Sequence, residues 1–467
     1  MPADSVSQSM HSGRPEEVIG SNIQVTLATG ELTTYAFLDN AASTPAMVAA
    51  AKAVTALLPW YASVHRGAGI KSRVSTAAFE AARLQIGRSL DVGDDHVVIF
   101  TKSTTEGINR LARLFGARHA IVFTSIMEHH ANLLPWRVNR CEVRYVQADA
   151  FGVIDEDDLR TQLRRAPSDR PRTVSVAGVY NVSGYAPPVH ELAVMAHESG
   201  AEIVVDAAQS IAHRRLSIRG MSAAEELDYV VFSGHKVYAP FGAGILICRR
   251  RMLELAEPSL VGGGIVDLVT LDEVVWNSLP DREEAGSPNV LGAVAIGAAL
   301  KRLDALGRDL LAAEEKALTS RTIGLLAAVP GLRILGPPDG PERAGVISFV
   351  MSRLPHTLVA AALSNEHGIG VRSGCFCAHP GVMHLLAEPE QVARTHLDQM
   401  RAHEHCFLPG AVRVSLGIQN SEEEILRLWA ALADLSEHGP YCEYEIDQQT
   451  GDYMPTSGID LPVVQLS

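Results

Sequence analysis

A lysine and an aspartate each follow an apolar stretch of the sequence, and the two residue types together suggest chemistry on a carbonyl compound. Lys236 closes the segment Ser233-Gly234-His235-Lys236 after the apolar run 228–232, and Asp206 ends the apolar run 203–205. A lysine at the carboxyl end of a buried strand lies where open α/β sheets bind ligands, and desolvation there makes its amine a nucleophile. A buried aspartate needs a cationic partner, and the protonated pyridine nitrogen of pyridoxal phosphate is one. Taken alone, Lys236 would be an ordinary surface lysine.

A hydroxyl-rich segment supplies the phosphate site that such a cofactor needs. Thr101-Lys102-Ser103-Thr104-Thr105-Glu106-Gly107 leads into a predicted helix, so its hydroxyls and free backbone N–H groups gather at a helix N-terminus. Ser103 and Glu106 also fit an ordinary capping box, and the segment alone does not separate the two interpretations. His129 follows the apolar run 120–124 and could stack on a pyridine ring, although a lone histidine there is more often structural.

These residues belong to an alternation of apolar runs and helical patterns. Helical patterns such as 105–115, 155–165 and 189–198 separate seven apolar runs, at 96–100, 120–124, 142–146, 173–179, 202–205, 229–232 and 244–248. The alternation is typical of a mostly parallel α/β sheet. Strands of such a sheet are buried on both faces, which explains why the runs are continuously apolar.

The length of the chain indicates more than one structural unit. Its 467 residues exceed the roughly 250–300 that one hydrophobic core serves, so we expect two domains. A long helical pattern over 290–329, broken at Gly307, leads into the second of them. We predict a loose arm at 1–30, a large domain at 31–300 whose first residues could join the smaller domain, a small C-terminal α/β domain at 301–437 and an irregular extension at 438–467.

The composition of the chain excludes some classes of binding partner and indicates its cellular compartment. The net charge is −14, from 40 basic and 54 acidic side chains, and the absence of a long basic run argues against nucleic-acid binding. No segment has the roughly 18–20 consecutive apolar residues of a membrane span, and the N-terminus lacks a secretory signal pattern. Six scattered cysteines are too few for a disulfide framework. We therefore expect a cytoplasmic protein that binds neither nucleic acid nor membranes.

The set of motifs resembles the class-V aminotransferase family of fold type I pyridoxal-phosphate enzymes, and within it the cysteine desulfurases and selenocysteine lyases. The matching segments keep their order from about residue 36 to residue 436: Leu38-Asp39-Asn40-Ala41-Ala42, Val64-His65-Arg66-Gly67, Thr104-Thr105-Glu106-Gly107-Ile108-Asn109, Glu128-His129-His130-Ala131-Asn132, Asn181-Val182-Ser183-Gly184, Asp206-Ala207-Ala208-Gln209, Ser233-Gly234-His235-Lys236, Ala285-Gly286-Ser287-Pro288-Asn289, Val371-Arg372-Ser373-Gly374, Cys377-Ala378 and Val412-Arg413-Val414-Ser415. The resemblance implies the fold type I architecture, with a mostly parallel seven-stranded sheet in the large domain and a smaller C-terminal α/β domain.

The resemblance also implies which residues hold pyridoxal phosphate. Four would contact its ring, namely Lys236 by a covalent bond, Asp206 at the pyridine nitrogen, His129 by stacking and Gln209 at the phenolic oxygen. Its phosphate would be held by Thr104, Thr105, Ser233 and His235. Ser287 stands where the family usually has threonine and would contact the phosphate of the other subunit, which implies a homodimer.

By the same resemblance, the substrate carboxylate would be bound by Asn181 and Arg372, with His65 and Arg413 as further substrate-binding residues. Arginine suits this role because its planar guanidinium can bind both carboxylate oxygens.

Cys377 decides which reaction the resemblance implies. In the desulfurases a cysteine at this place, on a loop over the cofactor, attacks the sulfur of the bound substrate as a thiolate and becomes a persulfide. The reaction would convert L-cysteine to L-alanine, with Lys236 moving protons, and would pass the sulfur to an acceptor protein or cofactor. Selenocysteine is a further candidate substrate. Taken alone, Cys377 would as readily be a small buried residue, and the surrounding segment 372–378 favours the nucleophile.

The same segment departs from ordinary desulfurases. Gly374-Cys375-Phe376-Cys377 resembles the corresponding segment of molybdenum-cofactor sulfurases, and so does the longer stretch up to Val412, which contains Cys406. Cys375 could relay sulfur or be an incidental neighbour. A metal site is chemically conceivable for Cys375, Cys377, His379, His403, His405 and Cys406, but their spacing gives it little support, and we predict no metal.

Two other functions stay open. A different class-V enzyme, such as another carbon–sulfur lyase, an epimerase or an aminotransferase, would use the same cofactor but would have no need of Cys377. A catalytically idle scaffold would have no need of Lys236 or of the other cofactor contacts.

Overall fold

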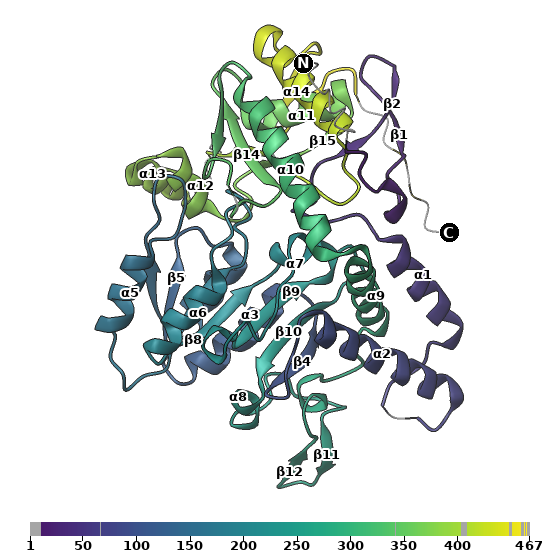
Figure 1. Cartoon of the computed structure of the whole chain (residues 1–467), viewed down its shortest axis with the longest axis vertical. Coiled ribbons are helices and arrows are strands. Elements are labelled where there is room, and N and C mark those ends of the chain that lie inside the picture. The colour runs from purple at the N-terminus through teal and green to yellow at the C-terminus, as the bar shows by residue number, and fades with distance from the viewer. Residues whose placement is uncertain are drawn as a thin grey trace, which may run out of the picture.

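Residues 11–65, 67–340, 342–402, 409–447 and 451–458, together with residues 462 and 464, are described by the computed structural model of this chain. They form a larger lobe around a central sheet and a smaller lobe above it (Figure 1). The middle of the chain, up to about residue 306, builds the larger lobe, and the C-terminal part builds the smaller one (Figure 1).

A seven-stranded sheet forms the centre of the larger lobe, in the order β4-β10-β9-β8-β7-β5-β6. Its strands are β4 (His96–Thr101), β5 (Ile121–Ser125), β6 (Glu142–Val146), β7 (Arg172–Ala177), β8 (Glu202–Asp206), β9 (Tyr229–Ser233) and β10 (Gly244–Arg249). Strands β5 to β9 pair in parallel, whereas β10 runs antiparallel to both neighbours, β4 and β9. The predicted mostly parallel seven-stranded sheet is confirmed.

Helices cover both faces of this sheet, which is why its strands read as continuous apolar runs. On one face Val97 and Ile99 of β4 belong to the same core cluster as Phe115 of α3 (Thr104–Gly116). On the other face Phe100 packs in a cluster with Phe79 of α2 (Ile70–Ser89). Successive residues of a strand point to opposite faces, so both sets must be apolar. The remaining helices of this lobe are α1 (Val48–Leu57), α4 (Leu134–Val138), α5 (Glu156–Arg165), α6 (Val189–Glu198), α7 (Ser210–His213) and α8 (Arg250–Glu254).

Two consecutive helices connect the lobes. Helix α9 (Val290–Leu306) packs against α1 and α2 of the larger lobe, and α10 (Arg308–Ala327) packs against the smaller lobe. They are separated by Gly307, whose φ of 88° is incompatible with a continuous helix, as the sequence predicted.

The smaller lobe contains a four-stranded antiparallel sheet in the order β13-β14-β17-β16. Its strands are β13 (Leu332–Leu335), β14 (Val346–Met351), β16 (Arg372–Gly374) and β17 (Ala411–Ser415), and its helices besides α10 are α11 (His356–His367), α12 (His379–Leu386), α13 (Glu390–Arg401) and α14 (Glu422–His438). A separate apolar core, which includes Phe349, Leu363 and Leu432, holds these elements together.

The N-terminal segment is not a loose arm over its described part, which corrects the expectation for residues 11–30. Strands β1 (Gln24–Thr26) and β2 (Leu32–Thr34) form a hairpin, and β3 (Ala36–Phe37) pairs in parallel with β15 (Ile369–Gly370) of the smaller lobe. Ion pairs join Arg14 to Glu314 of α10. Glu314 and β15 lie 300 or more residues away from their partners in this segment, so local composition could not reveal these contacts.

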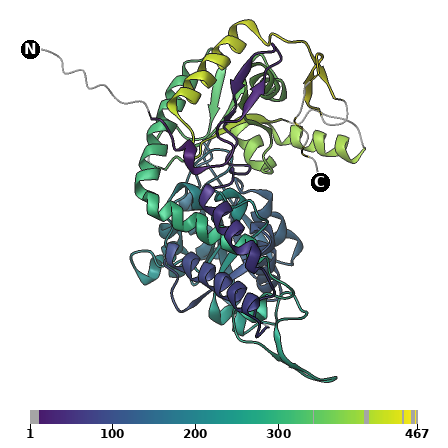
Figure 2. The ribbon, with the colours of Figure 1, turned by 90° about the vertical axis from the view of Figure 1, so that its right-hand side faces the viewer.

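Two further hairpins lie at the surface. Strands β18 (Tyr444–Ile446) and β19 (Tyr453–Pro455) pair within the predicted irregular extension, and the Glu366 carboxylate of α11 accepts hydrogen bonds from the Cys442 backbone N–H and the Tyr444 hydroxyl. Strands β11 (Val266–Val269) and β12 (Val274–Trp276) project from the far end of the larger lobe (Figure 2). Over the described residues, every helix is too short or too polar to cross a membrane.

Candidate active site

The carboxyl ends of the parallel strands open into a cavity of about 330 Å³ between the two lobes. Asp206 ends β8, Ser233 ends β9, and Lys236 follows in a short 3₁₀ turn. Twelve of the predicted site residues line this one cavity: Thr104, Thr105, His129, Asn181, Asp206, Gln209, Ser233, His235, Lys236, Arg372, Cys377 and Arg413. Side chains that are up to 309 residues apart in sequence therefore meet at the sheet edge where α/β folds bind ligands.

Burial shifts the pKa values of both Lys236 and Asp206, as expected for residues that follow buried strands. Burial disfavours the ammonium and lowers the pKa of Lys236 to about 8, although the Asp206 charge opposes this. Burial raises the pKa of Asp206, opposed by a hydrogen bond of 2.9 Å from the Ala208 backbone N–H to Oδ1. A pyridine N–H would give this buried carboxyl a further hydrogen-bond donor, so the chemistry of the pair fits pyridoxal phosphate.

The N-terminus of α3 forms a cradle with the end of β9. The Thr104 backbone N–H donates to Ser233 Oγ over 2.8 Å, and the two hydroxyl oxygens of these residues are also 2.8 Å apart. A Cβ on Gly244 would lie 2.6 Å from the Ser103 Cα, so only glycine lets β10 approach this turn. Ser103 Oγ accepts from the Glu106 N–H as a helix cap, while Thr104 and Thr105 line the cavity. The segment therefore caps the helix and also places Thr104 and Thr105 on the cavity.

His129 and Gln209 are fixed by short contacts within this cavity. His129 Nδ1 accepts a hydrogen bond of 3.0 Å from the Ala131 N–H, and burial together with the nearby Lys236 lowers the pKa of His129 to about 3. The ring is therefore neutral at physiological pH and can stack on an aromatic cofactor. Gln209 Nε2 donates to the Ala41 carbonyl over 2.7 Å, which orients its amide.

Two arginines face the cavity from neighbouring strands of the smaller lobe. Arg372 of β16 and Arg413 of β17 are directly paired in register. Arg413 is buried, and burial lowers its pKa to about 10, while Asp39 opposes this. Asp39 contacts both, with Oδ2 at 2.9 Å from Arg372 Nη2 and Oδ1 at 3.4 Å from Arg413 Nη2. These arginines provide the cationic site that an amino-acid carboxylate needs.

Cys377 is exposed and lies in a tight turn that borders the cavity. Phe376 and Cys377 both have a φ of 54°, a left-handed conformation that is costly for residues with a side chain. The Phe376 carbonyl accepts from Asn181 Nδ2 over 2.8 Å, and its ring lies 4.7 Å from the Arg413 guanidinium carbon. The turn is therefore held by the residues that also line the substrate cavity.

Sequence reasoning missed the roles of Asp39 and Phe376. Both lie inside motifs that were identified, but no local sequence feature indicates which residue each of them contacts. Asp39 directly follows the apolar pair Phe37-Leu38, and an acid in that position signals a buried ion pair without naming the cation. The contact between Phe376 and Arg413 depends on the tertiary fold and has no local signal.

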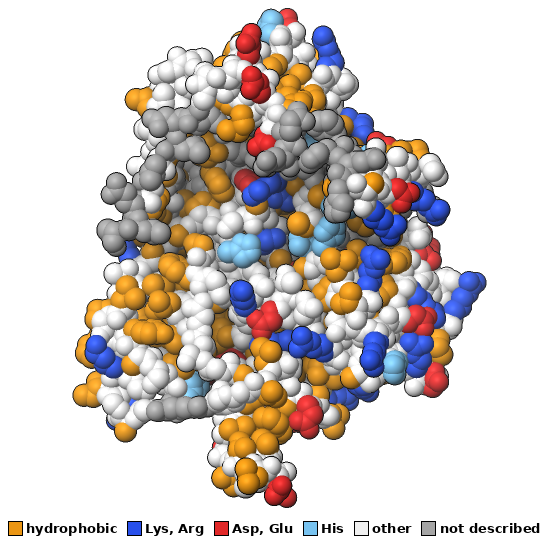
Figure 3. All heavy atoms as spheres, turned by 180° about the vertical axis from the view of Figure 1, so that it is seen from behind, with side chains coloured by type: hydrophobic (Ala, Val, Ile, Leu, Met, Phe, Trp, Pro, Cys, Tyr) orange, Lys and Arg blue, Asp and Glu red, His pale blue; other side chains and the backbone are white. Residues whose placement is uncertain are grey.

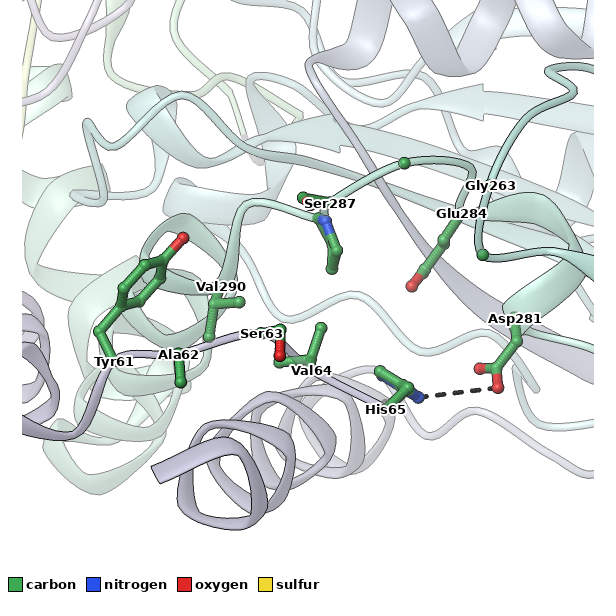
Figure 4. Close-up of a pocket in the computed structure, with 13 residues that line it drawn as sticks. Tyr61, Ala62, Ser63, Val64, His65, Gly263, Asp281, Glu284, Ser287 and Val290 are labelled. Carbon is green, nitrogen blue, oxygen red and sulfur yellow. Dashed lines mark ion pairs between the residues drawn. The ribbon is translucent and has the colours of Figure 1, made fainter. Parts of the chain in front are cut away.

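His65 and Ser287 lie outside the cavity of Lys236. They line a second cavity of about 420 Å³, together with Tyr61, Gly263 and Glu284 (Figure 4). His65 Nδ1 is 3.6 Å from Asp281 Oδ2 and its Nε2 is 3.3 Å from Glu80 Oε1. The prediction that His65 binds substrate therefore does not hold within a single subunit, whereas Ser287 was expected to act on another subunit.

The structure describes only part of the candidate metal site. His403, His405 and Cys406 lie outside the described residues, as does Arg66 of the motif around His65. Within the described ranges, no three His, Cys, Asp or Glu side chains are grouped to hold a metal ion.

Known proteins have similar sequences and a similar fold. The family described as "Aminotransferase class-V" matches residues 36–428. A cysteine desulfurase of Synechococcus elongatus is 35% identical over 379 residues, which are 79% of this chain and 55% of that protein. A cysteine desulfurase of Cronobacter sakazakii is 32% identical over 408 residues, which are 85% of this chain and 92% of that protein. This chain thus spans little more than half of the first relative and nearly all of the second.

A solved structure has the same architecture. The apo structure of cysteine desulfurase from Thermococcus onnurineus matches with a TM-score of 0.76 and 29% sequence identity, over 86% of this chain and 95% of that one.

Proposed function

This chain belongs to the class-V aminotransferase family, and from this we propose that it is a pyridoxal-phosphate-dependent cysteine desulfurase. It converts L-cysteine to L-alanine and takes the sulfur onto Cys377 as a persulfide. The observation that carries the proposal is the exposed Cys377 thiol on the rim of the cavity that contains Lys236 and Arg413. Another class-V reaction on an amino acid would not need a thiol there.

The residues of the cavity fit the cofactor. Asp206 would hold the pyridine nitrogen, His129 would stack on the ring, and Gln209 would contact the phenolic oxygen. The phosphate would lie at the N-terminus of α3, against the hydroxyls of Thr104, Thr105 and Ser233 and the ring of His235. When bound, pyridoxal phosphate draws electrons from the bonds at the substrate α-carbon.

The two arginines that line the cavity bind the substrate. Arg413 and Arg372 bind the carboxylate of L-cysteine, and Asn181 fixes the Cys377 turn from the opposite side through the Phe376 carbonyl. This arrangement places the amino acid between the Lys236 amine and the Cys377 thiol.

Lys236 and Cys377 then perform different tasks. With a pKa of about 8, the Lys236 amine can both take and release a proton at the substrate α-carbon near neutral pH. The Cys377 thiolate forms a bond to the substrate sulfur while the bond from that sulfur to the β-carbon breaks. The electron pair of the broken bond stays with the carbon, which takes up a proton and becomes the methyl group of alanine.

Mass spectrometry after incubation with L-cysteine tests this function. We expect one alanine for each sulfur removed from L-cysteine, and one added sulfur on Cys377 in peptides alkylated at the start of the reaction. Cys377→Ala should abolish both products and retain the cofactor absorption, whereas Cys442→Ser, a half-buried cysteine of the C-terminal extension, should behave like the wild type. Alanine formation by Cys377→Ala at the wild-type rate would overturn the proposal.

We further propose that the enzyme acts as a homodimer. Ser287 and His65 line a cavity separate from the site of their own subunit, so both are free to complete the site of a partner subunit. The adjacent β11–β12 hairpin exposes Leu268 (59%), Val275 (51%) and Leu271, and Figure 3 shows hydrophobic side chains gathered on this projection at the lower end of the molecule. An exposed apolar projection of this kind is typical of an interface.

Light scattering tests the dimer. Leu268→Asp should shift the molecular mass toward that of a monomer and lower activity, whereas Met221→Asp, at an exposed site in the loop before β9, should change neither. An unchanged mass for Leu268→Asp, or a monomeric wild type, would contradict it.

We also propose a cytoplasmic location and an acceptor protein or cofactor for the sulfur. The cysteines among the described residues are all free thiols, which supports a reducing compartment. Cell fractionation tests the location, and recovery of the enzyme outside the cytoplasmic fraction would contradict it.

A further inference from the structure

Two cysteines share the turn at the rim of the substrate cavity. Cys375 and Cys377 are the first and third residues of a turn closed by a hydrogen bond of 2.9 Å from the Ala378 N–H to the Cys375 carbonyl. Phe376 and Cys377, each with a φ of 54°, wind this turn like a left-handed helix. With a rise of about 1.5 Å and a radius of about 2.3 Å, residues two apart in such a turn have Cα atoms about 5.4 Å apart. Disulfides join Cα atoms about 4.4–6.8 Å apart, so the Cα spacing lies within the range of a disulfide, and bond formation requires the Cys375 side chain to rotate toward Cys377.

Contacts from three elements keep the turn in this conformation. The Cys377 carbonyl accepts a hydrogen bond of 2.7 Å from the His130 N–H, and the Phe376 carbonyl accepts one of 2.8 Å from Asn181. The Phe376 ring is held against Arg413. Residues with side chains keep a left-handed conformation only where surrounding contacts stabilise it. These contacts therefore keep the two cysteines close together.

The two thiols have different surroundings. Cys377 is exposed and lines the cavity, whereas Cys375 is half-buried and does not line it. Cys375 is therefore placed to react with Cys377 rather than with the substrate. Passing the sulfur from the exposed cysteine to the less exposed one would also move it away from an acceptor, which argues against a simple relay.

We propose that Cys375 resolves the persulfide on Cys377 and releases the sulfur as sulfide. This step rests on the proposed desulfurase function. The Cys375 thiolate attacks Cys377 Sγ, a bond forms between the two cysteine sulfurs, and the bond to the outer sulfur breaks. The outer sulfur leaves with the electron pair as hydrosulfide, HS⁻. The Cys375 sulfur is oxidised, the outer sulfur is reduced to sulfide and Cys377 Sγ keeps its oxidation state, so the step needs no external oxidant.

The disulfide would leave Cys377 unable to accept sulfur again. Another turnover therefore requires a dithiol reductant, which reopens the bond by thiol–disulfide exchange. The enzyme would thus release sulfide over repeated turnovers only when such a reductant is present, and without it would stop after one turnover.

A single-turnover experiment tests the step. The purified enzyme with its cofactor is mixed with L-cysteine in the absence of reductant, and alanine, sulfide and the tryptic peptide 373–394, which contains both cysteines, are measured after thiol alkylation. The wild type should release one sulfide for each alanine, and its peptide should be two hydrogens lighter than the reduced form and resist alkylation. A dithiol should restore turnover.

Cys375→Ser should still form alanine in the first turnover, but its peptide should keep one extra sulfur on Cys377, and sulfide release should fall at least tenfold. Cys141→Ser, which removes another half-buried thiol remote from the cavity, should match the wild type. A wild-type peptide that keeps the extra sulfur on either cysteine, or equal sulfide release by Cys375→Ser, would overturn the proposal. Absence of alanine from every variant would instead overturn the desulfurase function.

Discussion

Asp39 holds Arg372 beside the substrate cavity, with Asp39 Oδ2 at 2.9 Å from Arg372 Nη2 and 3.0 Å from Nε. The other carboxylate oxygen is 3.4 Å from Arg413 Nη2. One acid at the end of β3 therefore orients both cations on the sheet of the smaller lobe. Without it, the guanidinium of Arg372, whose side chain is 53% exposed, would have no partner to keep it at the cavity.

Asp39→Asn should weaken substrate binding more than it slows the chemistry. The amide cannot accept two charged contacts as strongly as a carboxylate, so both arginines lose orientation. We expect the KM for L-cysteine to rise about tenfold, which corresponds to about 1.4 kcal/mol, with a smaller change in kcat. Steady-state alanine formation measures both constants. Asp398→Asn, which removes an exposed acid of α13 that lies 3.6 Å from Arg401, is the control, and a KM equal to that of the wild type in Asp39→Asn would contradict the role of Asp39.

The pKa of Lys236 predicts how the cofactor-free protein takes up pyridoxal phosphate. Only the neutral amine attacks the aldehyde, and burial lowers the pKa of this amine to about 8. The rate of covalent attachment should therefore rise about tenfold for each pH unit below 8 and level off above it. Stopped-flow absorbance between pH 6 and pH 9.5 measures this profile, with Lys236→Arg as the variant that forms no covalent product. A rate that keeps rising to pH 9.5 would show that Lys236 has the pKa of an exposed lysine.

The parts of the site that could be predicted from the sequence are those that depend on residues close together along the chain. Lys236 and Asp206 each end an apolar run, and parallel strands bring such ends to one edge, so their proximity followed from the pattern. The break at Gly307 followed from the missing side chain in a helical stretch.

The parts that sequence could not predict depend on contacts between distant segments. Asp39 meets Arg372 across 333 residues, and β3 pairs with β15 across a similar separation. The N-terminal segment was expected to be loose because it is polar and rich in glycine, yet its order comes from ion pairs and backbone pairing with the smaller lobe. His65 belongs to one of the matching sequence segments but lies in a different cavity from Lys236, because a local motif does not specify which cavity its side chain will line.

A side chain at position 374 should destabilise the protein because of the backbone conformation of Gly374 alone. Its φ is 115°, and an added Cβ would meet no atom within 4 Å, so Gly374→Ala tests conformation without a clash. We expect a loss of about 1–3 kcal/mol in the free energy of unfolding and a lower kcat, because the strain displaces the Cys377 turn.

Urea unfolding and alanine formation measure the two effects of Gly374→Ala. The matched control is Gly324→Ala on the exposed face of α10, where the added Cβ is equally free of contacts. Alanine in a helix should stabilise the protein by about 0.4–1 kcal/mol. Equal effects of the two substitutions would contradict a special backbone conformation at Gly374.

The stacked pair His130 and His379 should make stability depend on pH. Their ring centroids are 5.1 Å apart, and His130 Nε2 lies 3.2 Å from His379 Nδ1. Burial lowers the pKa of both rings, so the unfolded chain, with histidine pKa values near 6.5, binds more protons than the folded one as the pH falls. Their contribution to stability is therefore complete above about pH 6.5 and is lost as the pH falls through the lowered pKa values.

The double variant His130→Asn/His379→Gln removes these two titrations. Between pH 6.5 and pH 5, its free energy of unfolding should fall less steeply than that of the wild type, by up to about 1.4 kcal/mol per pH unit for each proton. Urea unfolding at several pH values measures the slopes, and the difference between them isolates the pair from the other buried histidines. Identical slopes for the double variant and the wild type would show that the pair does not titrate with folding.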